Sequence, residues 1–247
     1  LNDLQERNVR MSLFVRIRQS FRALLFYVGF GIIVVASSFI CCILAFLPFR
    51  LLQRITTYGN RLSLGWLRVV CNIHVKVTGH EHIPEGPCVI LSNHQSTWDG
   101  FFMQWFFQPA SMILKRELLW IPIFGWSLYF MRPIAIERAN PASAIRSILK
   151  YGERRLKEGN RIVMYPEGTR GPPDKLGAFK SSGAAIAKKA SVVILPVGHN
   201  AGKYWLHHNF LKRSGTIHLQ IGPAIDSEHG SARELTKQAR DWIESVL

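Results

Sequence analysis

The chain has 247 residues, enough for one large α/β domain or two small ones, and its 48% hydrophobic content excludes an intrinsically disordered protein. Its net charge of +15 favours anionic partners. Because the basic residues concentrate around an apolar N-terminal run, and no zinc-finger spacing or RNA-recognition signature occurs, we expect anionic membrane lipids and phosphorylated substrates, and no nucleic acid.

Residues 11–72 are expected to anchor the chain to a membrane. No charged residue occurs between Arg22 and Arg50, and this run exceeds the roughly 20 residues that an apolar helix needs to cross a bilayer. Both flanks are basic, so charge asymmetry leaves open a true span and a helix that enters one leaflet. Residues 1–10 precede Met11, a candidate start, and are interpreted as an added or upstream segment.

A second helix is predicted after the apolar run. Five apolar residues share one of its faces: Leu52, Ile55, Leu62, Trp66 and Val70. Three arginines lie on the opposite face: Arg54, Arg61 and Arg68. This pattern fits an amphipathic helix in the membrane interface, or an ordinary helix packed on the following domain. Gly59 and Gly65 suggest a break in it.

Residues 73–247 alternate short apolar strands with helical patterns. Strands are predicted at 73–77, 88–91, 111–114, 134–136, 161–165, 192–197 and 217–221. Helices are predicted up to Phe107 and at 142–156, 182–190 and 233–246. The alternation predicts a single α/β domain with a mostly parallel or mixed sheet flanked by helices, preceded by the N-terminal membrane helices. In such sheets, sites gather beyond the carboxyl ends of the strands.

His94 and Asp99 follow an apolar strand within the segment 93–99, Asn-His-Gln-Ser-Thr-Trp-Asp. A neutral imidazole can take a proton from a hydroxyl, and a carboxylate on its other nitrogen fixes the tautomer. On one continuous helix the two side chains would lie about 140° apart, so they meet only if the chain bends, with Ser96 or Thr97 as the helix cap. The pair is interpreted as a base and its orienting group; a capping or core histidine is the alternative.

Four segments in order resemble the blocks of the glycerolipid acyltransferase family. The segment 93–99 resembles its histidine–four residues–aspartate motif. The segment 165–170, Tyr-Pro-Glu-Gly-Thr-Arg, resembles its glutamate-glycine-threonine-arginine motif, with tyrosine where phenylalanine is commoner. Residues between 115 and 138 resemble the intervening block, and 195–197, Leu-Pro-Val, the fourth. The resemblance is strongest to the bacterial branch that acylates lysophosphatidic acid.

The resemblance implies a role for each matched residue. His94 is expected to be the base and Asp99 its partner, with direct acyl transfer rather than acylation of Ser96. The expected phosphate ligands are four cations: Arg170, Arg138, Lys115 and Lys180. The loop residues Glu167, Gly168 and Thr169 are expected to contact the substrate, and Glu167 either binds a substrate hydroxyl or braces Arg170.

The same resemblance implies substrates and a location. The acyl donor is expected to be acyl-CoA or acyl-carrier-protein, the acceptor lysophosphatidic acid, and the product phosphatidic acid. No bound cofactor and no metal are expected, and the location is the inner membrane with the site facing the cytoplasm. Alternatives are another acceptor (glycerol-3-phosphate, another lysophospholipid or an ornithine-type lipid) or a non-catalytic membrane protein that binds anions.

The sequence does not decide the roles of two further groups of residues. Six aromatic residues serve either core packing or a surface for acyl chains: Trp98, Phe101, Phe102, Trp105, Phe106 and Phe107. Three histidines form no metal-ligand pattern with nearby acids and are expected to be solvated or structural: His199, His207 and His208.

Overall fold

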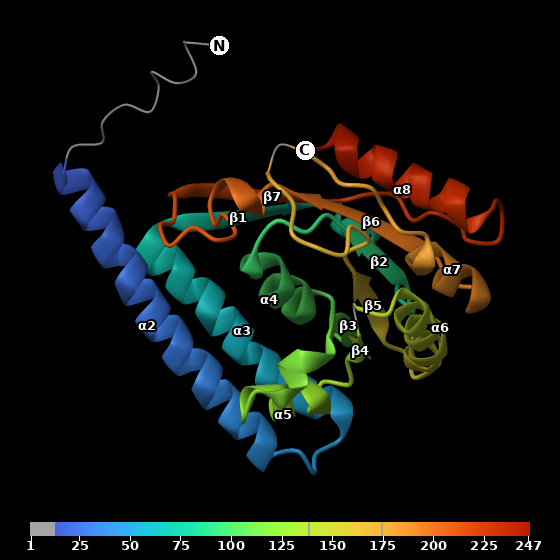
Figure 1. The fold of residues 1–247 in the computed structure, drawn as a ribbon, viewed down its shortest axis with the longest axis horizontal. Coiled ribbons are helices and arrows are strands. Elements are labelled where there is room, and N and C mark those ends of the chain that lie inside the picture. Colours follow the sequence, from blue (N-terminus) through green and yellow to red (C-terminus); the bar gives the residue numbers. More distant parts are fainter. Residues whose placement is uncertain (1–12, 138, 174) are drawn as a thin grey trace.

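The computed structural model describes residues 13–137, 139–173 and 175–247 (Figure 1). Two predictions lie outside the described residues: the interpretation of 1–10 as an added or upstream segment, and the role of Arg138 as a phosphate ligand.

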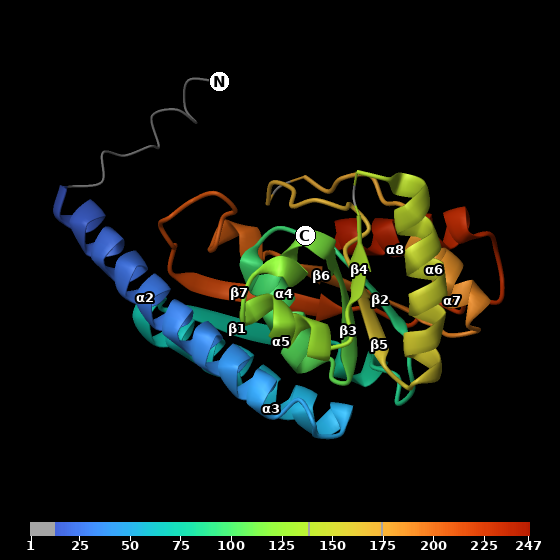
Figure 2. The same cartoon turned by 60° about the horizontal axis from the view of Figure 1, so that its bottom comes forward.

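Two long helices precede the sheet. Helix α2 (Leu13–Ile43) is followed by a turn and by α3 (Phe49–Cys71), which returns alongside it in both views (Figures 1 and 2). The stretch Val15–Ile43 is long and apolar enough to cross a membrane, and only 17% of its most apolar window is buried. Exposed apolar side chains such as Ile32 and Val35 therefore indicate that this helix associates with a membrane.

Helix α3 is continuous, so the expected break is wrong. Gly59 lies where α3 packs against α2, and a Cβ there would approach Ser37 Oγ to 1.9 Å. The glycine thus permits close helix packing. Helix α3 also contacts α4 and β1, which matches the packed-helix alternative. The predicted apolar face is only partly buried, since Leu62 is 48% exposed while small and polar residues such as Thr57 face the protein.

Seven strands form one mixed sheet, as expected. They are β1 (Ile73–Thr78), β2 (Val89–Ser92), β3 (Ala110–Lys115), β4 (Ile134–Ile136), β5 (Arg161–Met164), β6 (Ile194–His199) and β7 (Gly215–Ile221). The strand order is β1-β7-β6-β2-β5-β3-β4. Neighbouring strands are parallel except β6 and β7, which are antiparallel.

Helices cover both faces of the sheet (Figures 1 and 2). The remaining helices are α4 (Thr97–Phe106), α5 (Phe124–Phe130), α6 (Pro141–Lys157), α7 (Ser182–Lys189) and α8 (Ala232–Ser245), with single 3₁₀ turns at His80–His82, Arg116–Trp120 and Ala201–Lys203. Successive strand residues point to opposite faces. Ile90 packs in a core with α2, α3 and α4, whereas Val89 and Leu91 pack in a second core with α6, α7 and α8.

The sheet brings two predicted loops to one edge. Strands β2 and β5 are parallel neighbours, so their carboxyl ends meet there. The segment 93–99 follows β2 and the segment 165–170 follows β5. The prediction that these two motifs lie at the same sheet edge is therefore confirmed.

Candidate active site

The chain bends between His94 and Asp99 as the sequence predicts. Ser96 is extended, with φ of −148°, and is the N-cap of α4; its Oγ accepts a hydrogen bond from the Trp98 amide at 3.1 Å. Asp99 occupies the third position of the helix and turns back toward the loop. His94 Nδ1 lies 3.1 Å from each oxygen of the Asp99 carboxylate.

The Asp99 carboxylate is completely buried and saturated with donors. Oδ2 accepts hydrogen bonds from the amides of Gln95 at 3.0 Å and Ser96 at 2.9 Å, and it lies 3.6 Å from His199 Nε2. Burial by itself would raise the pKa of Asp99, but His94, His199 and the Ser96 amide together hold it below its ordinary value. The carboxylate is therefore ionised and keeps the proton of His94 on Nδ1.

The imidazole of His94 is held on two sides and open on a third. Its side chain is 12% exposed. The Tyr165 ring stacks on it, with centroids 4.1 Å apart and planes at 13°. Among the described residues, no group hydrogen-bonds to His94 Nε2, and His94 lines two cavities. With Nδ1 protonated, Nε2 is the acceptor that a substrate hydroxyl can reach.

Glu167 braces the histidine loop, not Arg170. One carboxylate oxygen accepts a hydrogen bond from the His94 amide at 2.8 Å, and the other accepts from the Gly177 amide at 2.9 Å. The His94 carbonyl in turn accepts from the Gly171 amide at 2.8 Å. The two motif loops are therefore joined through the Glu167 carboxylate and a backbone hydrogen bond. No described hydrogen bond or ion pair joins Glu167 to Arg170, and binding of a substrate hydroxyl by Glu167 stays a prediction.

The first cavity contains the predicted phosphate ligands Arg170 and Lys115. It has a volume of about 490 Å³ and lies between the two motif loops and helices α2, α3, α4 and α5. Arg170 Nη1 lies 3.1 Å from His207 Nδ1, and Arg170 Nε is buried without a hydrogen-bond partner among the described residues. No described carboxylate forms an ion pair with Arg170, whereas Lys115 pairs with Glu117 at 3.2 Å. Thr169 also lines this cavity.

The second cavity contains Gly168 and Lys180. It has a volume of about 940 Å³ and is lined by α6, α7 and α8, with Ile145 and Ile148 among its apolar residues. Gly168 has a left-handed φ of 77°, and a Cβ there would lie 3.1 Å from Lys180 Nζ. The predicted phosphate ligands are thus divided, because Lys180 lines a different cavity from Arg170.

Most of the six aromatic residues serve the core. Trp98, Phe102 and Phe107 are buried, and Trp105 and Phe106 pack against them. Phe101 differs, because it lines the first cavity. Core packing therefore accounts for five of the six, and one contributes to a surface near His94.

Two histidines are closer to the site than the sequence suggests. His199, at the end of β6, is buried, and its Nε2 lies 2.9 Å from the carbonyl of Asn93. Burial lowers the pKa of His199, so it is a structural histidine, as expected, that also contacts Asp99. His207 contacts Arg170 from a loop between β6 and β7. The shared sheet edge was a signal for His199, whereas nothing in the sequence places His207.

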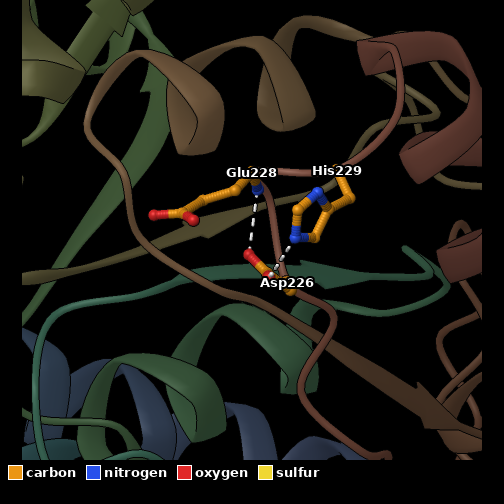
Figure 3. Close-up of side chains that lie close together, drawn as sticks. All are labelled: Asp226, Glu228 and His229. Carbon is orange, nitrogen blue, oxygen red and sulfur yellow. Dashed lines mark hydrogen bonds and ion pairs between the residues drawn. The ribbon is translucent and has the colours of Figure 1, made fainter.

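Among the described residues, one group of acidic and histidine side chains is close enough to hold a metal ion: Asp226, Glu228 and His229 (Figure 3). All three are exposed. Contacts within the loop account for their proximity, since Asp226 accepts a hydrogen bond from the Glu228 amide at 2.9 Å and lies 3.8 Å from His229 Nε2. This cluster does not line either cavity at His94.

Comparison with known proteins gives a consistent result. Residues 74–200 match the model of the acyltransferase family. The 1-acyl-sn-glycerol-3-phosphate acyltransferase of Pseudomonas aeruginosa is 42% identical over 93% of this chain and 91% of its own length. The human 1-acyl-sn-glycerol-3-phosphate acyltransferase beta is 30% identical over 72% of this chain and 67% of its own length.

A solved structure shares the fold. The crystal structure of the 1-acyl-sn-glycerophosphate (LPA) acyltransferase PlsC from Thermotoga maritima superimposes with a TM-score of 0.78, covering 94% of this chain and 95% of that chain at 24% identity. With a family model that matches residues 74–200 and a relative that is 42% identical over nearly the whole length, the chain belongs to the acyltransferase family.

Proposed function

We propose that this protein transfers a fatty acyl group from a thioester donor to the sn-2 hydroxyl of 1-acyl-glycerol-3-phosphate, giving phosphatidic acid. The observation that carries the proposal is a histidine paired with a buried carboxylate, in the same cavity as an arginine to which no described residue supplies a carboxylate partner. The 42% identity to a 1-acyl-sn-glycerol-3-phosphate acyltransferase supports the choice of acceptor.

In the proposed reaction, His94 Nε2 removes the proton of the acceptor hydroxyl as its oxygen attacks the thioester carbonyl. The resulting tetrahedral intermediate collapses with cleavage of the carbon–sulfur bond. The imidazolium then returns the proton to the leaving thiolate. Asp99 holds the imidazole in the required tautomer and stabilises its cationic form. Ser96 is buried and caps α4 through its Oγ, which supports direct transfer without an acyl-enzyme.

The acceptor is proposed to occupy the first cavity. A phosphate monoester there can pair with Arg170, since guanidinium and phosphate form two parallel hydrogen bonds, and Lys115 adds a second cation. The apolar walls contributed by Val34 and Phe101 suit the acyl chain of the acceptor. The second cavity, which also reaches His94, provides room for the donor, either acyl-CoA or acyl-carrier-protein.

Membrane attachment is proposed to involve one leaflet of the inner membrane, with the site on the cytoplasmic side. The rest of the fold packs against α2 between residues 26 and 41. Phe26 contacts Trp205 at one end of this stretch, and Cys41 Sγ contacts the Ser127 carbonyl at the other. A polar domain beside the helix would not fit in the hydrocarbon of a full span. Exposed arginines such as Arg61 are placed to meet anionic headgroups.

An acceptor panel tests the function. Purified full-length protein in detergent micelles is given acyl-CoA or acyl-carrier-protein with lysophosphatidic acid, glycerol-3-phosphate, lysophosphatidylcholine or an ornithine lipid. We expect phosphatidic acid from lysophosphatidic acid and far slower transfer to the others. Faster acylation of a different acceptor would replace the proposed substrate. Binding to anionic vesicles with no transfer to any acceptor would favour the non-catalytic alternative.

A further inference from the structure

The loop that carries His207 is attached to the membrane helix α2. Trp205, next to the start of this loop, is buried and meets Phe26 edge to face with ring centroids 5.0 Å apart. Phe210 stacks on Tyr27 with centroids 5.4 Å apart. Aromatic pairs of this kind stabilise a contact beyond the area that they bury. The loop between 204 and 212 is therefore packed against α2 on one side.

Lys212 closes the same loop. Its side chain is 5% exposed, yet no described carboxylate pairs with it. Lys212 Nζ donates to Tyr27 Oη at 2.7 Å and to the carbonyls of Asn209 at 3.2 Å and Phe210 at 2.9 Å. It also lies 4.4 Å from the centroid of the Tyr27 ring. One buried cation thus joins the loop backbone to α2.

The other side of the loop meets Arg170. His207 is half-buried and lines the first cavity together with Arg170 and His94. Burial and the neighbouring charge of Arg170 lower the pKa of His207, which leaves the imidazole neutral at neutral pH. A neutral ring can accept on Nδ1, and the 3.1 Å contact with Arg170 Nη1 has this polarity. The Arg170 guanidinium is then held by a side chain that carries no charge.

We propose that His207 is a positioning residue for the phosphate of the acceptor, and that the attachment of its loop to α2 holds it in place. The inference rests on the proposed function, in which Arg170 binds that phosphate. A long arginine side chain loses rotational freedom when it binds an anion, and a partner that fixes the guanidinium beforehand reduces this loss. The contact uses one N–H of Nη1, and among the described residues no group hydrogen-bonds to Nη2, so donors of the guanidinium remain for a ligand.

Binding measurements without donor test the inference independently of turnover. The dissociation constants of lysophosphatidic acid and of monoacylglycerol, which lacks the phosphate, are measured with full-length protein in detergent micelles. We expect His207→Ala to weaken lysophosphatidic acid binding about tenfold and to leave monoacylglycerol binding unchanged. His207→Asn, which keeps an acceptor near the position of Nδ1, should recover most of the loss.

A matched control is a histidine away from this loop. His218 on β7 is exposed and lines neither cavity at His94, so His218→Asn should bind like the wild type. Wild-type affinity in His207→Ala, or equal weakening for both lipids, would overturn the inference. Wild-type protein that binds lysophosphatidic acid without acylating it would overturn the proposed function instead.

A double-mutant cycle separates positioning from general damage. If His207 acts through Arg170, then His207→Ala should have no further effect on lysophosphatidic acid binding in an Arg170→Ala background. Additive losses would show that His207 acts by another route. Tyr27→Phe, which removes the hydroxyl that accepts from Lys212 and keeps the ring, should weaken binding about twofold to threefold; no change would reject the role of α2.

Discussion

The two cavities that meet at His94 differ in whether their half-buried arginine has a carboxylate partner among the described residues. In the first, Arg170 has no carboxylate partner among the described residues. In the second, the half-buried Arg240 pairs with Glu244 at 2.9 Å, and the other cations, Lys180, Arg233 and Lys237, are exposed. A half-buried arginine with no described carboxylate partner, beside a histidine, is the stronger sign of an anionic ligand, so the first cavity suits the phosphate of the acceptor.

The walls of the two cavities differ as well. The first is bounded by the apolar helix α2 and by α3, α4 and α5, and the second by α6, α7 and α8. In the proposed reaction, the lipid acceptor would therefore enter from the side of α2 and the donor from the side of α6, α7 and α8. The comparison implies that mutations in the first cavity should change the acceptor KM and mutations in the second cavity the donor KM. Mutations at His94, which lines both cavities, should change kcat.

The largest effect is expected for His94→Ala. Loss of the base should lower kcat by about 10³-fold to 10⁴-fold, the upper part of the range of about 10²-fold to 10⁴-fold that general acid–base catalysis typically contributes. The KM values for donor and acceptor should change little. Stopped assays of phosphatidic acid formation measure this, with circular dichroism and vesicle binding as controls for folding. Activity close to the wild type would reject the mechanism.

Asp99→Asn is expected to lower kcat by about 10²-fold to 10³-fold. The amide cannot stabilise the imidazolium and can leave His94 in the wrong tautomer. Since both substrates depend on the same imidazole, the two KM values should again change little. A selective rise of one KM would mean that Asp99 serves one cavity only.

The same variant should alter stability in acid. The pKa of Asp99 is depressed in the folded protein, so its contribution to stability is present above the unfolded value of about 3.9 and is lost as the pH falls through the lower folded value. The free energy of unfolding of the wild type should therefore fall more steeply below about pH 4 than that of Asp99→Asn. Urea titrations at several pH values measure the difference, and parallel curves would contradict it.

Arg170→Ala should raise the KM for lysophosphatidic acid about tenfold to a hundredfold and leave the donor KM unchanged, since hydrogen bonds to a charged group are lost from one substrate only. Arg240→Ala is the matched control, because it removes an arginine from the second cavity that is already paired with Glu244. Equal effects of the two substitutions on the acceptor KM would erase the distinction between the cavities.

The smallest effect is expected for Ile145→Trp. Ile145 is half-exposed on the wall of the second cavity, so a larger side chain can be accommodated by the fold while it narrows the cavity. The donor KM should rise a few-fold, with no change in the acceptor KM. Initial rates at varied acyl-CoA and varied lysophosphatidic acid distinguish the two. A rise in the acceptor KM instead would exchange the proposed substrates between the cavities.

The parts of the site that could be predicted are those whose contacts are local. His94 and Asp99 meet because helix α4 begins between them, and Ser96 is a typical N-cap residue. The placement of the segment 165–170 beside them followed from the rule that parallel strands end at one edge. Both predictions needed only the residues of one loop and the order of strands along the chain.

The parts that could not be predicted depend on packing between distant segments. Glu167 had two expected partners, but it meets backbone amides at His94 and Gly177 that carry no sequence signal. His207 reaches Arg170 because its loop is held by α2, which lies far earlier in the chain, as in the 185-residue separation of Lys212 from Tyr27. The break predicted at Gly59 was wrong because the sequence does not show that this glycine packs against Ser37 of the neighbouring helix.

The Asp99 carboxylate takes part both in the folding of α4 and in the orientation of His94. Asp99 closes the first turn of α4 through the amides of Gln95 and Ser96, and the same group orients the imidazole. A nascent or heat-softened chain in which this turn has frayed therefore lacks a competent base, even with the sheet intact. Heat inactivation should consequently precede global melting.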